Sequence, residues 1–153
     1  MFSLHIDTAR SWRGGQNQVL LTVNGLRAAG QRAALVAHPD GELRKRAAEG
    51  LDLIPIAVRT EADLGAGWRL ARVLGRLRPD VIQAHDPHAV ALASTALSLG
   101  AASRWRAGQR APALIATRRV DFHLKANAFS RWKYRQVDCF IAASEAIRQM
   151  LIG

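Results

Sequence analysis

The chain has 153 residues, of which 49% are hydrophobic and 22% charged, as in an ordinary soluble globular domain. The longest nearly apolar run, Ala89–Leu99, is too short to cross a bilayer. The N-terminus shows no signal-peptide pattern, so we expect a cytoplasmic protein. The single cysteine, Cys139, excludes an internal disulfide, and its apolar surroundings predict a buried thiol.

The net charge of +10 arises from 22 Lys and Arg against 12 Asp and Glu. The charge is uneven, because Arg104–Arg135 holds nine basic residues and one acid, Asp121. This excess predicts an anionic partner, such as a phosphorylated substrate, an anionic membrane or a nucleic acid. A solvated surface of an arginine-rich chain is the alternative. No known nucleic-acid-binding motif is present, so we expect no nucleic-acid partner.

The chain begins with a strand-like run, Phe2–Asp7, followed by a glycine-containing loop. Apolar residues at helical spacing then predict a helix over Gln16–Ala29, and Gly30 is placed to cap its C-terminus. Arg32–Ala37 is the second predicted strand.

After a turn, Glu42–Glu49 predicts a short helix and Leu53–Val58 a third strand. The next predicted helix, Trp68–Leu77, has an apolar inner face that includes Leu70 and an outer face of arginines. Pro79 stops this helix.

Asp80–Ala84 is the fourth predicted strand. His88–Leu99 predicts a helix that is apolar nearly all round and therefore well buried, ending at Gly100. The basic stretch Ala101–Pro112 predicts a loop, and Ala113–Thr117 a fifth strand.

The second half of Asp121–Gln136 predicts a helix, Cys139–Ala143 a sixth strand, and Ser144 the N-cap of a closing helix. Six strands with intervening helices predict an α/β fold, a three-layer, Rossmann-like, doubly wound parallel sheet. Ligands bind such sheets at the edge where the strands end, so the loops there are candidate sites.

Gly14 and Gly15 lie between the first strand and the first helix. Glycines there let a phosphate approach the backbone, and the helix N-terminus offers free N–H groups. A plain tight turn is the alternative. The stretch lacks the spacing of a dinucleotide fingerprint, which disfavours a dinucleotide cofactor.

His85-Asp86-Pro87-His88 follows the fourth strand. Its imidazoles and carboxylate could act as acid–base groups or orient a sugar hydroxyl. The alternative is that Asp86 caps the next helix, with Pro87 at the first helical position.

Two adjacent arginines, Arg118 and Arg119, follow the fifth strand and suit a phosphate or an acidic sugar. Asp121 could act as a base or pair with an arginine, and His123 lies two residues farther on. No nucleophile elbow accompanies these groups, so a Ser/His/Asp triad is not indicated. The candidate catalytic residues are His85, Asp86, Arg119, Asp121 and His123, and the candidate phosphate-binding residues are Gly14, Gly15 and Arg118.

Phe129, Trp132 and Tyr134 are interleaved with basic residues, as at a membrane interface or a stacking surface. Packing of the aromatic rings on the sheet, with solvated charges, is the alternative. The candidate residues for an acceptor or anionic surface are Arg13, His88, Lys125, Arg131 and Lys133. We expect no metal site.

Several segments, in this order, resemble the N-terminal domain of glycosyltransferase family 4. They are the glycine loop with the helix ending at Leu26–Gly30, the strand Ala33–Ala37, the segment Arg78–Asp86 and the segment Val137–Arg148. The resemblance covers nearly the whole chain. The family consists of retaining, metal-independent transferases of the two-domain GT-B fold.

The resemblance implies that residues 1–153 form the acceptor-side domain, with the glycine loop near the donor diphosphate. It implies a nucleotide-sugar donor, a glycan or lipid-linked acceptor, and no metal or other cofactor. The family commonly has a histidine just after the fifth strand, where this chain has Arg118 or Arg119. That departure suggests an anionic acceptor, as in lipopolysaccharide or another cell-envelope glycan.

The family's C-terminal donor-binding domain is absent from these residues, so we expect the chain to be inactive alone. A peripheral contact with an anionic membrane at its cytoplasmic face is a further candidate. The alternative function is a stand-alone Rossmann-like module that binds a phosphorylated ligand.

Overall fold

The computed structural model describes residues 1–47, 49–119 and 127–152. Its centre is a six-stranded sheet with parallel strand pairs in the order β3-β2-β1-β4-β5-β6. The strands are β1 (Phe2–Asp7), β2 (Arg32–Ala37), β3 (Asp52–Pro55), β4 (Val81–Ala84), β5 (Ala113–Arg118) and β6 (Cys139–Ala142). This order is that of a Rossmann-like fold, and the predicted fold class is confirmed.

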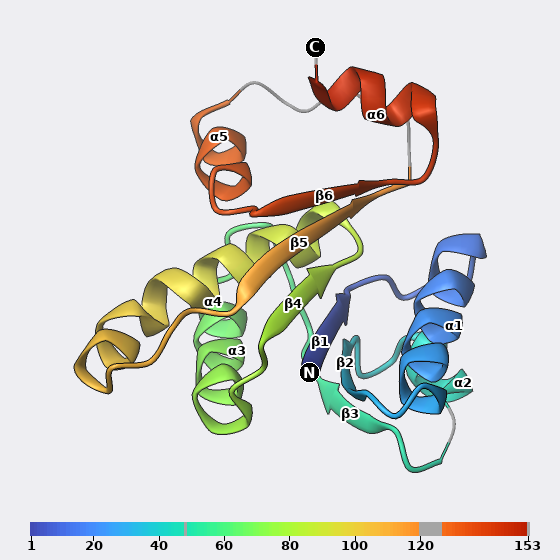
Figure 1. The fold of residues 1–153 in the computed structure, drawn as a ribbon, viewed down its shortest axis with the longest axis horizontal. Coiled ribbons are helices and arrows are strands. Elements are labelled where there is room, and N and C mark those ends of the chain that lie inside the picture. The colour runs from blue at the N-terminus through green and yellow to red at the C-terminus, as the bar shows by residue number, and fades with distance from the viewer. Residues whose placement is uncertain (48, 120–126, 153) are drawn as a thin grey trace.

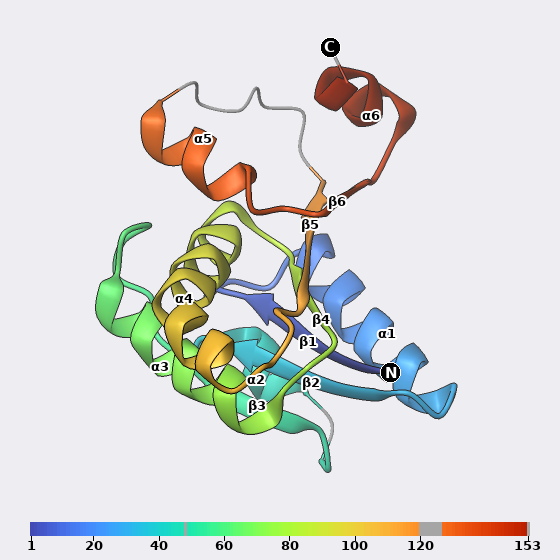
Figure 2. The ribbon, with the colours of Figure 1, turned by 60° about the vertical axis from the view of Figure 1, so that its left-hand side comes forward.

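Helices lie on both faces of the sheet, which gives three layers (Figure 1). One layer consists of α1 (Gly14–Ala28) and α2 (Glu42–Arg46), which pack on the β1–β3 half of the sheet. On the opposite face α3 (Leu64–Leu77) and α4 (Pro87–Arg106) lie side by side (Figure 2). The helix α5 (Ala128–Tyr134) packs against α4, and α6 (Glu145–Ile152) follows β6.

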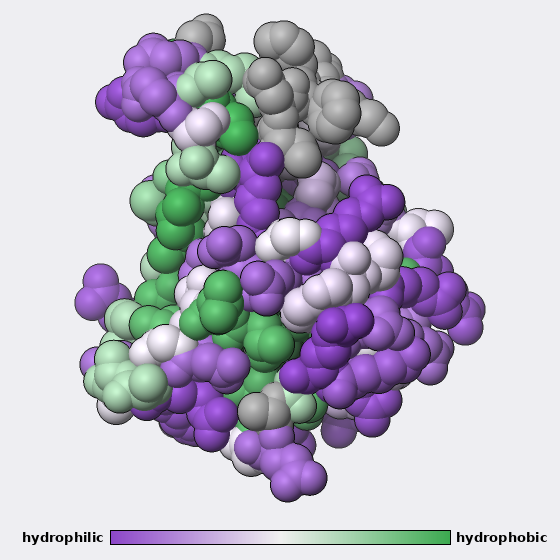
Figure 3. Space-filling model, turned by 90° about the vertical axis from the view of Figure 1, so that its right-hand side faces the viewer, coloured by the Kyte–Doolittle hydropathy of each residue, from purple (hydrophilic) through white to green (hydrophobic). Residues whose placement is uncertain are grey.

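The larger hydrophobic core lies between the sheet and the α3–α4 pair. Leu4 and Ile6 of β1 are buried there against Leu70 of α3, whose inward position was predicted from its helical spacing. A smaller core joins Val19 and Val23 of α1 to the other face of β2. On the face viewed in Figure 3, hydrophilic side chains cover most of the surface around smaller hydrophobic areas.

The helix α4 is longer than predicted, because it continues through Gly100 to Arg106. The prediction of a basic loop over Ala101–Pro112 was therefore wrong for its first half. A glycine inside a helix weakens it by only about 1 kcal/mol relative to alanine, and packing against α3 outweighs that cost. The real terminator is Gly108, whose φ is +62° and after which Gln109 donates its N–H to the Arg104 carbonyl.

Other boundaries moved by a few residues. The helix α3 begins at Leu64 because Asp63 caps it, with its Oδ1 accepting from the Ala66 N–H at 2.9 Å. The strand β3 ends at Pro55, and α2 ends at Arg46. Cys139 is exposed on the outermost strand β6, so its predicted burial was wrong. None of the helices in the described ranges is long and apolar enough to span a bilayer.

Candidate functional site

A cavity of about 360 Å³ opens where β1, β4 and β5 end, beside the N-terminus of α1. The strand order reverses between β1 and β4, and ligands bind Rossmann-like sheets at such a point. Of the predicted site residues that the structure describes, six lie around this cavity. They are Arg13, Gly15, His85, Asp86, Arg118 and Arg119.

Three hydrogen bonds from the protein itself hold the carboxylate of Asp86. Its Oδ1 accepts from the Ala89 N–H and from the Thr8 hydroxyl, both at 2.8 Å. Its Oδ2 accepts from the Thr8 N–H at 2.7 Å. Asp86 therefore caps α4, with Pro87 as the first helical residue, and holds the loop after β1 against that helix. The capping interpretation is confirmed, and an acid–base role for Asp86 stays a prediction.

The guanidinium of Arg119 lies over the start of α1. Its Nη2 is 2.6 Å from Nδ1 of His85, and a Cβ atom added to Gly15 would lie 2.5 Å from its Nη1. Burial lowers the pKa of Arg119, while the carboxylates of Asp7 and Asp86 act in the opposite direction. Arginine stays protonated in proteins, so a fixed cation stands beside the helix N-terminus. This is an arrangement that attracts an anion.

Beneath Arg119 lies a polar network that sequence reasoning missed. Nε2 of His85 is 3.0 Å from Nδ1 of His5, and Nε2 of His5 is 3.1 Å from the Ser3 hydroxyl. Burial lowers the pKa of His5 to about 4. Burial, with added repulsion from His5 and Arg119, lowers the pKa of His85 well below its usual value. Both imidazoles are therefore neutral at pH 7.

Asp7 belongs to the same buried face of β1. Its carboxylate accepts from the Ala9 N–H at 3.0 Å and from the Gln16 amide at 3.1 Å. Burial, and to a lesser degree the nearby charge of Asp86, raises the pKa of Asp7 against these two hydrogen bonds. One signal for these residues was available in the sequence. In a buried strand, polar side chains alternate with the apolar Leu4 and Ile6, which predicts one polar face.

The remaining predicted residues near α1 and β5 take different positions. Gly14 is the exposed first residue of α1. Arg13 precedes it, lines the cavity and donates its backbone N–H to Gln16 Oε1 at 3.1 Å. Arg118, the last residue of β5, is buried and also lines the cavity.

Two predicted surface residues lie apart from the cavity, and one prediction was wrong. His88 and Arg131 are exposed on α4 and α5. Lys133 was predicted on the surface, but its side chain is only 2% exposed. Its Nζ lies 3.2 Å from Glu61 Oε1 and donates to the Pro87 carbonyl at 3.3 Å. A partner 72 positions away, together with the packing of α5, keeps this cation inside.

Asp121, His123 and Lys125 lie outside the described residues, so their roles stay predictions. Tyr134 is a further lining residue that sequence reasoning had treated only as part of an aromatic surface. Burial raises the pKa of Tyr134.

Comparisons with known proteins give the family context of this site. A family model described as "Glycosyl transferase 4-like domain" matches residues 13–153. No curated protein matches the chain.

Solved structures share its fold. A lipopolysaccharide outer core galactosyltransferase WaaB superposes with a TM-score of 0.68 at 10% identity, over 99% of this chain and 41% of that protein. HepE from Anabaena, in complex with UDP-glucose, gives 0.71 at 14% identity, over 99% and 40%. MurG from Acinetobacter baumannii gives 0.65 at 14% identity, over 95% and 42%. The chain thus spans about two fifths of the length of these structures.

Proposed function

The chain belongs to the glycosyl transferase 4-like domain family, and we propose that it is the acceptor-side half of a retaining glycosyltransferase. In this proposal a sugar passes from a nucleotide-sugar donor to a hydroxyl group of the acceptor. The supporting observation is the cavity at the end of β1, β4 and β5, where Arg119 and the N-terminus of α1 meet above Gly15.

The chemistry of the cavity suits the departure of a nucleoside diphosphate. Stabilising the charge that develops on a leaving group is usually a large part of catalysis. Arg13, Arg118 and Arg119 and the N–H groups of α1 would offer positive charge without a metal or other cofactor. His85 holds Arg119, and Asp86 holds the loop before α1, so both would act on the site by fixing its geometry.

We further propose that a second, donor-binding domain completes the site, because this chain spans about two fifths of the related glycosyltransferase structures. The cationic character of the cavity favours a phosphorylated or acidic acceptor of a cell-envelope glycan. The similarity in fold to WaaB, a lipopolysaccharide outer core galactosyltransferase, supports this class.

The test compares the 153-residue chain with a version extended by a donor-binding domain, each titrated with UDP-glucose and assayed for sugar transfer. We expect only the extended protein to bind and transfer, and Arg119→Gln to weaken both. The exposed Arg44→Gln on α2 is the matched control, because it removes the same charge at a residue that does not line the cavity. If the short chain alone binds the nucleotide tightly, it is a stand-alone module for a phosphorylated ligand and the transferase proposal fails.

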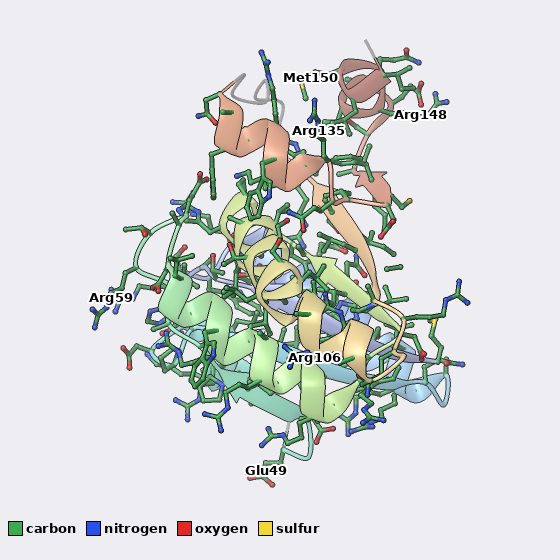
Figure 4. All side chains as sticks on the ribbon, turned by 90° about the vertical axis from the view of Figure 1, so that its left-hand side faces the viewer. Glu49, Arg59, Arg106, Arg135, Arg148 and Met150 are labelled. Carbon is green, nitrogen blue, oxygen red and sulfur yellow. The ribbon has the colours of Figure 1, made fainter. Side chains whose placement is uncertain are left out.

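We also propose that this half-enzyme contacts an anionic membrane through the outer side of α3 and α4. Leu64 and Trp68 of α3 and Leu99 of α4 are 66%, 55% and 46% exposed. No acid occurs from Leu64 to Arg78, whereas arginines recur along the outer side of α3. Arg72 stacks over the Trp68 ring at 4.9 Å, and Figure 4 shows Arg106 on the last turn of α4. Exposed tryptophan flanked by arginines suits the boundary between lipid headgroups and acyl chains.

Co-sedimentation with vesicles tests this contact. We expect binding to vesicles that contain phosphatidylglycerol and not to phosphatidylcholine vesicles. Arg72→Ala should weaken binding about fivefold, because a basic residue near an anionic surface contributes about 1 kcal/mol. Arg44→Ala on α2, at the other face of the sheet, should change little. Equal losses in both variants would mean that the net charge alone attracts the chain.

A further inference from the structure

Four side chains form one continuous line of hydrogen bonds from the interior of the sheet to the cavity. The line starts at Ser3 and His5 on the central strand β1, passes to His85 after β4, and ends at Arg119 after β5. His5 is fully buried, and the rings of His5 and His85 are inclined by only 18°. Nothing in the proposed transfer reaction touches Ser3 or His5 directly.

The donor and acceptor of each hydrogen bond in this line follow from Arg119, at the cavity end. A guanidinium can only donate, so Nδ1 of His85 must accept from Arg119 and carry no proton. A neutral His85 then bears its proton on Nε2 and donates to Nδ1 of His5. His5 in turn bears its proton on Nε2 and donates to the Ser3 hydroxyl. Only this tautomer of each ring fits. In the reverse tautomers the Nδ1–H group of His85 would face the N–H groups of the Arg119 guanidinium.

We infer that His5 is a positioning residue, which fixes the tautomer of His85 so that His85 holds the Arg119 guanidinium over Gly15. What Arg119 then binds rests on the proposed function. The hydrogen-bond line itself does not, because it is a property of the folded chain. Neutral imidazoles are required throughout, since a proton on His85 Nδ1 would replace the acceptor that Arg119 needs.

The simpler alternative is that His5 only fills space in the core, with its nitrogens satisfied by the nearest polar groups. Both interpretations predict that removing His5 lowers stability. The two interpretations differ in what they predict for Arg119. A space-filling His5 would not affect the position of the Arg119 guanidinium, whereas a positioning His5 affects that position through His85.

Long-range 1H–15N correlation spectra of the 153-residue chain at pH 7 provide the first test. We expect His5 and His85 to show protonated Nε2 and bare Nδ1. We expect Arg119→Gln, a change at the cavity that leaves the core intact, to shift the ring nitrogens of His85 and also those of His5. A protonated Nδ1 on His85, or a His5 signal that does not respond, would overturn the inference.

A matched pair of variants, made in the protein extended by a donor-binding domain, provides the second test, with inorganic pyrophosphate as the probe. In His5→Asn the side-chain oxygen can replace the Nδ1 acceptor, whereas His5→Leu leaves the His85 donor without a partner. We expect His5→Leu to weaken pyrophosphate binding about fivefold, as for the loss of one hydrogen bond, and His5→Asn to restore it. In an Arg119→Gln background His5→Leu should have no further effect.

The outcomes separate the two proposals. Equal binding by the Asn and Leu variants, both folded by circular dichroism, would refute the positioning role. The wild type could bind no pyrophosphate and still show the expected tautomers and the expected response of His5 to Arg119→Gln. In that case the positioning role of His5 stands, and the proposed phosphate-binding role of the cavity fails. If His5→Leu does not fold, the spectra of the Arg119→Gln variant still decide.

Discussion

The buried imidazole of His5 makes the stability of the fold depend on acid, and the sign follows from its pKa. Burial lowers that pKa from 6.5 to about 4 in the folded state. Between these values the unfolded chain binds a proton that the folded chain does not, so stability is complete above pH 6.5 and falls as the pH drops toward 4. Each pKa unit corresponds to about 1.4 kcal/mol, so the loss from His5 alone reaches about 2.5 kcal/mol at pH 4.5.

Two neighbours modify this loss. The lowered pKa of His85 adds a loss of the same sign. The raised pKa of Asp7 acts in the opposite direction, because the folded state then binds a proton more readily than the unfolded state as the pH falls. A comparison of the wild type with His5→Asn isolates the histidine, since the variant retains both neighbours and an acceptor for His85.

Urea unfolding followed by circular dichroism at pH 7.5, 6.0, 5.0 and 4.5 gives the free energy of unfolding at each pH. We expect the wild type to lose about 2.5 kcal/mol more than His5→Asn between pH 7.5 and pH 4.5. His88→Asn, an exposed site on α4, should follow the wild-type curve. Parallel curves for wild type and His5→Asn would refute the claim that burial keeps His5 neutral.

Two further predictions use matched substitutions. A Cβ atom added to Gly67 in α3 would overlap the methyl group of the β-branched Thr95 in α4, whereas one added to Gly75 meets nothing within 4 Å. Gly67→Ala should therefore destabilise by about 1–3 kcal/mol and Gly75→Ala should stabilise by about 0.5–1 kcal/mol in urea unfolding; the same sign for both would contradict the packing argument. Arg78 has a φ of +51°, which only glycine adopts readily, whereas Arg76 is helical. Thermal unfolding should show Arg78→Gly to cost at least about 1 kcal/mol less than Arg76→Gly, and equal costs would mean that the left-handed backbone at position 78 is not strained.

Much of the fold could be predicted from the sequence, because periodic patterns report burial directly. The apolar stripe of α3 and the apolar run of α4 gave the helices, and short apolar runs gave the strands. Glycine was a less reliable signal. Gly30, with a φ of +77°, does end α1, but Gly100 lies inside α4, where packing against α3 outweighs its weak helix propensity.

The site was predicted less completely, because its decisive contacts join residues far apart in the chain. The meeting of Gly15 with Arg119 followed from the rule that parallel strands end at one edge. The burial of Lys133 did not, since it depends on Glu61 and on the packing of α5. His5 was missed because a histidine in a strand-like run was interpreted only as part of a strand.

The polar face of β1 connects the fold of the sheet with the geometry of the cavity. Burying Ser3, His5 and Asp7 in the central strand costs desolvation that aliphatic side chains would avoid, although each has hydrogen-bond partners. Those partners lie on β1 itself, in the loop after it, on α1 and after β4, and the line continues to Arg119 after β5. An aliphatic face could hold the same sheet, but it could not direct a guanidinium over Gly15. The buried polar groups therefore serve the geometry of the cavity more than the stability of the fold, and their alternation with Leu4 and Ile6 is the sequence signal of that purpose.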